Sequence, residues 1–154
     1  MYRGQVLSLH LTPRAFLPMK SRQTVLLVEG RGVEGDRYFN KTGYYSDLID
    51  LGRELTLIED EALDQIERDY HIRLERAEHR RNITTKNVPL SHLVGKRVRI
   101  GCAIIEGTRI STPCRHIEQI TGKPVFTAML HRCGLNARVV RTGVVSVNDV
   151  IEPA

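Results

Sequence analysis

The chain has 154 residues, of which 41% are hydrophobic and 27% charged, a composition that predicts a globular protein and excludes a disordered one. The formal net charge of +5 suits an anionic ligand in a basic pocket or weak attraction to nucleic acid, without deciding between them. No apolar run approaches the length of a membrane-spanning helix, and no signal peptide precedes the first strand-like segment. We therefore expect a single domain over residues 1–154 with no membrane partner.

The sequence contains three cysteines, an odd number, and lacks an export signal. Such a chain is typical of a reducing compartment, where disulfides do not form a structural framework. We therefore expect a cytoplasmic protein without structural disulfides.

The first predicted elements are two strands near the N-terminus. Residues 5–11 alternate, so that Val6, Ser8 and His10 fall on one face and leucines on the other, as in a half-buried strand. Residues 23–29 are rich in valine and leucine and predict a second strand.

A glycine-rich segment follows, with three glycines among residues 30–35. Glycine allows positive φ angles and a close approach of the backbone to a ligand. One interpretation is a ligand-facing loop in which Asp36 and Arg37 pair with each other or touch the ligand. The other is a tight turn with a solvated ion pair. Residues 39–52 are long and polar for a loop, which predicts either a lid over a site or disorder.

The clearest helical pattern covers residues 59–70, where Ala62, Leu63 and Ile66 recur at helical spacing. The three acids over residues 59–61 complement the macrodipole of a helix start. We interpret them as helix-start residues and not as a catalytic cluster.

Two arginines and an asparagine lead into a short β-branched strand within residues 79–85. The planar guanidinium of arginine suits a phosphate or a fused heterocycle. This segment is therefore either a site for such a ligand or a basic surface turn.

The second half of the chain is dominated by strand patterns. Residues 96–106 predict one strong strand, with Val98, Ile100 and Cys102 on the same face, so that Cys102 is expected in the core. Short strands at regular spacing and a single long helix predict an antiparallel β-barrel or barrel-like sandwich with peripheral helices.

The segment from Thr112 to Glu118 holds Cys114 directly after a proline and directly before Arg115 and His116. A short helix is predicted to follow, with Gly122 as its C-terminal cap. A helix start with cationic neighbours favours the thiolate of Cys114, which would then be a nucleophile, a sulfur carrier or a soft-metal ligand. The alternative is an inert, packed cysteine.

Taken in order, these motifs resemble a MOSC domain, the C-terminal domain of molybdenum cofactor sulfurases, and most closely its small free-standing bacterial subgroup. The resemblance covers residues 5–150, and the ordered set of motifs is more specific than any single one. The motifs are Val-Glu-Gly-Asp-Arg-Tyr (33–38), Thr-Leu-Ile-Glu (56–59), Arg-Arg-Asn-Ile-Thr-Thr (80–85), Leu-Val-Gly-Lys-Arg-Val-Arg-Ile-Gly (93–101) and Thr-Pro-Cys (112–114).

The resemblance implies a MOSC, or pyruvate-kinase-barrel-like, antiparallel β-barrel with one long and one short peripheral helix. It also implies a pocket for the molybdenum cofactor (molybdopterin) or a related pterin. Cys114 would carry a persulfide or bind molybdenum through its thiolate. The cofactor-binding candidates are Arg81, Asn82, Gly35, Asp36, Arg37, Thr112, Arg115 and His116.

Two chemistries are compatible with this assignment. In one, Cys114 accepts sulfur from a cysteine desulfurase and passes it on. In the other, Cys114 ligates molybdenum, and N-hydroxylated compounds are reduced with electrons from an electron-transfer protein. A non-catalytic module for nucleic acid or protein ranks lowest, because no aromatic platform interleaves the arginines in the sequence.

The sequence departs from the family pattern at two positions. Cys133 stands where glycine is expected, and it is either a second thiol near the site or a space-filling residue. Asn148 stands where glycine is usual, a mild change because asparagine tolerates left-handed backbone geometry. The pyridoxal phosphate of full-length sulfurases belongs to their other domain, and no candidate lysine for it is found here.

Overall fold

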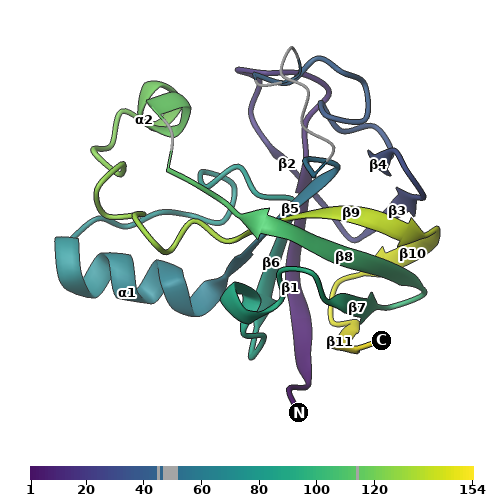
Figure 1. Ribbon diagram of the computed structural model, residues 1–154. Coiled ribbons are helices and arrows are strands. Elements are labelled where there is room, and N and C mark those ends of the chain that lie inside the picture. The colour runs from purple at the N-terminus through teal and green to yellow at the C-terminus, as the bar shows by residue number, and fades with distance from the viewer. Residues whose placement is uncertain (45, 47–51, 114) are drawn as a thin grey trace.

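The computed structural model describes residues 1–44, 46, 52–113 and 115–154 of the chain, and Figure 1 shows it as a ribbon. The helices are α1 (Asp60–Tyr70) and α2 (Arg115–Thr121), with a 3₁₀ turn at Leu90–His92. The strands are β1 (Gly4–Leu11), β2 (Lys20–Arg22), β3 (Thr24–Val28), β4 (Gly32–Val33), β5 (Leu55–Glu59), β6 (Ile83–Lys86), β7 (Arg97–Ile100), β8 (Ala103–Ile110), β9 (Leu135–Arg141), β10 (Gly143–Ser146) and β11 (Val150–Pro153).

The main sheet closes into a barrel. Its strand order is β11-β7-β8-β9-β5-β6-β1-β2. A further pairing of β11 with β1 closes the barrel, and β2 lies outside this ring, paired with β1. A smaller sheet of order β10-β3-β4 lies against the barrel (Figure 1). The predicted mainly β barrel with one long and one short helix is confirmed.

One strand pair departs from the expected antiparallel arrangement. β5 and β6 run parallel, with Leu57 opposite Ile83. Between these two strands, α1 returns the chain to the edge of the sheet at which β5 begins, so that β6 runs in the same direction as β5. Parallel neighbours need such a crossover connection, and the helix of the crossover covers the sheet. β5 is accordingly buried on both faces, with Leu57 in the barrel interior and Ile58 under α1.

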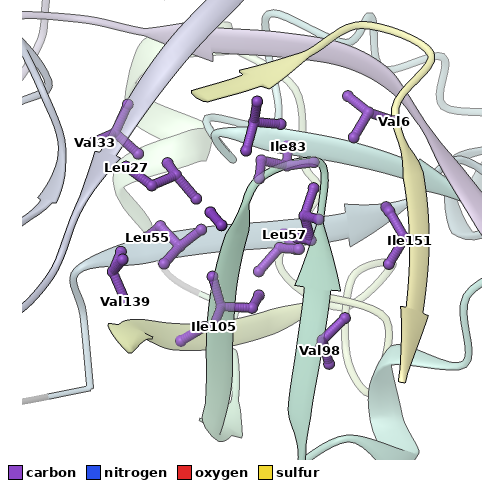
Figure 2. Packing of buried hydrophobic residues seen from close by; sticks show 14 of the residues in the cluster. Val6, Leu27, Val33, Leu55, Leu57, Ile83, Val98, Ile105, Val139 and Ile151 are labelled. Carbon is purple, nitrogen blue, oxygen red and sulfur yellow. The ribbon is translucent and has the colours of Figure 1, made fainter. Parts of the chain in front are cut away.

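The barrel interior is filled by aliphatic side chains from every wall. Figure 2 shows Val6 of β1, Leu57 of β5, Ile105 of β8 and Ile151 of β11 converging on one another, and each is at most 1% exposed. Burial of this much apolar surface is the main favourable term in the stability of the fold.

Two strand predictions needed correction. A bulge between Val6 and Ser8 shifts the register of β1, so that Val6 and Leu9, predicted on opposite faces, both enter the core. The segment 96–106 is a hairpin of β7 and β8 and not one strand. Cys102 therefore lies in the turn and is exposed, because the turn resets the alternation and Ala103 takes the inward position.

Both helices lie on the same side of the barrel (Figure 1). α1 packs there through Ala62, Leu63 and Ile66, and Ile117 of α2 joins the same second apolar cluster outside the barrel. Of the acids predicted at the start of α1, Asp60 and Glu61 occupy its first turn, and Glu59 precedes them as the N-cap. Gly122 follows α2 at φ 69° and closes it by donating its N–H to the Glu118 carbonyl at 2.9 Å.

Asn148 adopts φ 75°, which agrees with the expectation that asparagine takes a left-handed position here. The long segment 39–52 falls partly outside the described residues, so its prediction as a lid or a disordered loop stays a prediction. Within the described ranges, neither helix combines the length and hydrophobicity that a bilayer crossing requires.

Candidate functional site

A pocket of about 330 Å³ lies against the outer wall of the barrel, next to α2. Thr56 of β5 and Asn136 of β9 contribute to it, because each alternates with core residues and so projects from the outer face of its strand. The lining residues are Arg37, Tyr38, Arg53, Thr56, Arg80, Arg81, Arg109, Ser111, Thr112, Pro113, His116, Ile117 and Asn136.

The pocket is strongly cationic. Five of the lining residues are arginines, and none of those described is a carboxylate. Arginines gathered in a partly enclosed space focus a positive potential and offer many N–H donors to one ligand. This arrangement is suited to a phosphate or another multivalent oxyanion.

Arg37 is held in place by the glycine-rich loop. Its Nη1 donates to Asp36 Oδ1 at 3.0 Å, and its Nη2 donates to the Arg80 carbonyl at 2.8 Å. Asp36 is fully buried, also accepts the N–H of Thr12, and does not line the pocket. Gly35 takes φ 86° and lies outside the lining, so that of the three predicted rim residues Arg37 alone reaches the pocket.

Arg80 and Arg81 come from the segment that precedes β6. Arg80 Nη1 donates to the Leu17 carbonyl at 2.6 Å, and Arg81 Nε donates to the Cys133 carbonyl at 2.9 Å. Both side chains are less than 10% exposed and both line the pocket. The segment is therefore a built part of the protein and not a basic surface turn.

Asn82 serves the barrel and does not line the pocket. Its Oδ1 accepts the N–H of Thr56 at 3.0 Å, and its Nδ2 donates to the His10 carbonyl at 3.2 Å. The buried side chain thus joins the backbones of β1 and β5. Its predicted contact with a pterin stays a prediction.

His116 is 5% exposed and lines the pocket from α2. Its ring stacks on Tyr44 at 4.3 Å and meets the edge of Phe16 at 4.8 Å between centroids. Neither ring nitrogen has a hydrogen-bond partner within the described part of the chain. Burial, with Arg80 and Arg37 nearby, lowers the pKa of His116 to about 4, so the imidazole is neutral at physiological pH.

The Thr-Pro-Cys motif meets the pocket through Thr112 and Pro113, which both line it. Cys114 itself lies outside the described residues. Arg115, also predicted as a cofactor contact, is directed elsewhere. Its side chain is exposed, pairs with Glu118 at 3.0 Å and lies over the ring of Phe126.

Cys133 is fully buried in the cluster outside the barrel, where its Sγ donates to the Met129 carbonyl at 2.7 Å. Its side chain packs in that cluster, and its backbone carbonyl accepts a hydrogen bond from Arg81, while its role as a second thiol or as a space-filling residue stays a prediction. The distance between Cys133 and Cys114 is not described, because Cys114 lies outside the described residues.

Several lining residues were not predicted from the sequence, among them Tyr38, Arg53, Arg109 and Asn136. Tyr38 lies beside both Arg37 and Arg53, with ring-to-guanidinium distances of 4.7 and 5.7 Å. The structure thus places one aromatic ring beside two of the pocket arginines. Arg109 and Asn136 are polar residues within strands that also carry apolar core residues, and nothing in the local sequence showed that the two converge.

No group of three or more histidine, cysteine, aspartate or glutamate side chains able to hold a metal ion occurs among the described residues. A metal bound in this pocket would therefore need a ligand from the undescribed positions, from the cofactor itself, or from both.

The fold and the site define a closed β-barrel protein with an arginine-rich pocket on its outer wall. The sequence matches the MOSC domain over residues 34–152, and the chain belongs to the MOSC domain family. The resemblance seen in the sequence motifs is thereby confirmed.

Solved structures share this architecture. YuaD from Bacillus subtilis superimposes with a TM-score of 0.82 at 18% identity, covering 98% of this chain and 97% of that one. YiiM from Geobacillus stearothermophilus gives 0.76 at 13% identity, covering 98% and 75%. YiiM from Escherichia coli gives 0.69 at 18% identity, covering 97% and 69%. Likeness at these identities shows the fold, and no curated protein matches the sequence.

Proposed function

We propose that this protein binds a molybdenum cofactor, or a related pterin that carries a phosphate, in the arginine-rich pocket and uses Cys114 as its reactive thiol. One observation carries the proposal. Five arginines line a pocket to which Thr112, Pro113 and His116, the residues around Cys114 in the sequence, also contribute. Association of the MOSC family with the molybdenum cofactor supports the same assignment.

The described residues fit such a ligand. Arg37 and Arg81 have guanidinium groups held by hydrogen bonds to fixed partners, which lowers the entropy cost of binding a phosphate. Thr112 offers a hydroxyl, and neutral His116 offers one donor and one acceptor nitrogen. A bound molybdenum centre would supply two-electron redox chemistry, and a thiolate is a suitable soft ligand for it.

The first chemistry for Cys114 is sulfur transfer. Its thiolate would attack the outer sulfur of a persulfide on a cysteine desulfurase, forming a new S–S bond while the old one breaks and the desulfurase thiolate leaves. The transfer needs no external electrons. The positive potential of the pocket would stabilise the anionic persulfide that results.

The second chemistry is reduction of an N-hydroxylated compound. Conversion of the hydroxylamine to an amine consumes two electrons and two protons and releases water, so an electron-transfer protein must supply the electrons. In this version Cys114 would be a molybdenum ligand, and the arginines would hold the cofactor.

The proposal is tested on protein purified from its native host, by metal analysis and by the fluorescence of the oxidised pterin. Arg81→Ala should weaken pterin binding about tenfold to a hundredfold, the value of a hydrogen bond to charge. Arg97→Ala is the matched control, because it removes the same charge from an exposed ion pair with Glu106 outside the pocket. Equal pterin content in the two variants, or none in the wild type, would contradict the proposal.

Arg81→Ala should also lower the stability of the fold. Arg81 is 8% exposed, and its removal takes a donor away from the buried Cys133 carbonyl. A loss of roughly 1–3 kcal/mol in stability should accompany the loss of binding. Affinities must therefore be compared per folded molecule.

Metal-free wild-type protein separates the two chemistries. A sulfur carrier should gain the mass of one sulfur on the Cys114 peptide when desulfurase and cysteine are supplied, and reductant should remove it. A reductase should instead lose its activity in proportion to molybdenum content. Cys114→Ser would abolish both activities and so cannot choose between them.

Nucleic acid binding is the alternative of a different class, and the proximity of Tyr38 to two arginines gives it some support. A single-stranded oligonucleotide that binds more tightly than the pterin, with a steep salt dependence, would favour that alternative.

A further inference from the structure

Arg80 and Arg81 are consecutive residues, yet both side chains line the same pocket. Neighbouring residues of an extended chain point to opposite faces. If the backbone before β6 were extended, only one of the two arginine side chains would point into the pocket. Here Arg80 takes φ 63°, the left-handed region that is unfavourable for a residue with a long side chain. Something must therefore hold the backbone in this turn.

His79 makes the contact that closes the turn. Its Nδ1 accepts the backbone N–H of Arg81 at 2.9 Å, a bond from residue i to residue i+2 like that of an Asx turn. A backbone amide can only donate, so Nδ1 carries no hydrogen. In the neutral ring Nε2 then carries it and donates to Thr84 Oγ1 at 2.9 Å.

The histidine is fully buried, and its surroundings keep it neutral. His10 of β1 faces it edge-on at 6.4 Å, and the positive charges acting on it are Arg81 and Arg76 of its own segment. Burial first, and then these groups, lower the pKa of His79 well below its usual 6.5. Nδ1 therefore remains an acceptor at physiological pH.

Among the described residues, two contacts hold Arg81. His79 fixes its backbone, and the Cys133 carbonyl fixes its guanidinium through Nε. The Arg80 carbonyl, within the same turn, receives Nη2 of Arg37 at 2.8 Å. The geometry of three pocket arginines consequently depends on this one turn.

We propose that His79 is a positioning residue of the pocket: by accepting the Arg81 N–H it holds the turn that directs both Arg80 and Arg81 at an anionic ligand. The inference deepens the proposed function and relies on it for the anionic character of the ligand. His79 itself is not in the pocket lining and acts only through the arginines.

The test compares variants by titration with inorganic pyrophosphate as the probe. His79→Leu keeps an apolar volume but cannot accept the N–H, and it should bind about tenfold more weakly, the value of one misplaced hydrogen bond to charge. His79→Asn restores an acceptor that can reach residue i+2 and should bind within about threefold of wild type. An asparagine variant no better than the leucine variant would overturn the proposal.

Thr84→Val is the matched structural control. It removes the acceptor of the His79 Nε2–H bond and leaves the Nδ1 bond in place. We expect lower stability with nearly unchanged affinity for pyrophosphate. A loss of affinity equal to that of His79→Leu would show a general packing effect and overturn the positioning role.

Nitrogen NMR of the wild type tests the turn without any variant. The expected result is a hydrogen on His79 Nε2, a bare Nδ1 and slow exchange of the Arg81 amide. A hydrogen on Nδ1, or fast exchange of that amide, overturns the proposal. If the wild type binds neither pyrophosphate nor pterin, the proposed function fails, whereas the tautomer and amide exchange still report on the turn.

Discussion

The interior of the barrel and the region around the pocket bury different kinds of side chain. Inside the barrel every wall contributes aliphatic side chains, whose contacts are non-directional (Figure 2). At the pocket end the chain buries ionisable and amide groups, most of which are fixed by directional hydrogen bonds, whereas His116 packs against aromatic rings. These buried polar residues include His10, Asp36, Arg37, His79, Arg80, Arg81, Asn82 and His116.

The barrel interior therefore stabilises the fold, whereas the buried polar groups around the pocket lower the stability and serve the site. Apolar burial favours folding at almost any shape that fills the space. Buried charges cost free energy unless each is paired or hydrogen-bonded, and they constrain geometry in return. The buried arginines of the pocket thus lower the stability, and the apolar interior of the barrel offsets that cost.

The largest effect is expected from breaking the buried ion pair. Asp36→Ala leaves Arg37, which is 4% exposed, without its carboxylate, and should cost about 3–5 kcal/mol of unfolding free energy. The measurement is urea unfolding. Glu152→Ala, which breaks an exposed pair with Arg3, should cost less than about 1 kcal/mol. Similar losses in the two variants would refute the contrast.

A cavity in the barrel interior should lower the free energy of unfolding by about 2–5 kcal/mol without changing ligand affinity. Leu57→Ala opens a cavity at a side chain that is 1% exposed, and stability should fall by that amount. Leu57 does not line the pocket, so affinity for an anion per folded molecule should stay unchanged. Val144→Ala at an exposed position should change stability by less than about 0.5 kcal/mol.

Acidification should destabilise the folded protein through the buried histidines near the pocket. Burial lowers the pKa values of His10 and His79, so between their folded values and the usual 6.5 the unfolded chain binds more protons. Stability therefore rises with pH in that window and falls as pH drops below about 6.5. Thermal unfolding at pH 7 and pH 5 measures the change, and His79→Asn should reduce it. An equal slope in that variant would contradict the assignment.

The smallest effect concerns the cysteines. Cys102→Ser at the exposed hairpin turn should change stability by less than about 0.5 kcal/mol, whereas Cys133→Ser in the apolar cluster should cost more. Alkylation followed by peptide mass should label Cys102 in the folded protein and Cys133 only after unfolding. Cys114 should react faster than Cys102 at pH 7, and an equal or slower rate would remove the case for a reactive thiolate.

Local sequence patterns were sufficient to predict most of the secondary structure and to identify the family. The apolar spacing of Ala62, Leu63 and Ile66 predicted α1, because a helix needs only one covered face to be recognisable. Valine- and leucine-rich segments predicted the strands, and the ordered motifs identified the MOSC domain. The involvement of Arg37, Arg81, Thr112 and His116 in one site was also predicted, through motifs that each of them occupies.

Which residues come into contact depends on the three-dimensional fold and could not be predicted from local patterns. The bulge in β1 and the turn at Cys102 each moved a residue to the other face, because strand alternation is reset by a single residue. Arg53, Arg109 and Asn136 join the pocket from segments far apart in the chain, a convergence set by closure of the barrel. Local pattern cannot contain that information, since the pairing of β1 with β11 joins the two ends of the sequence.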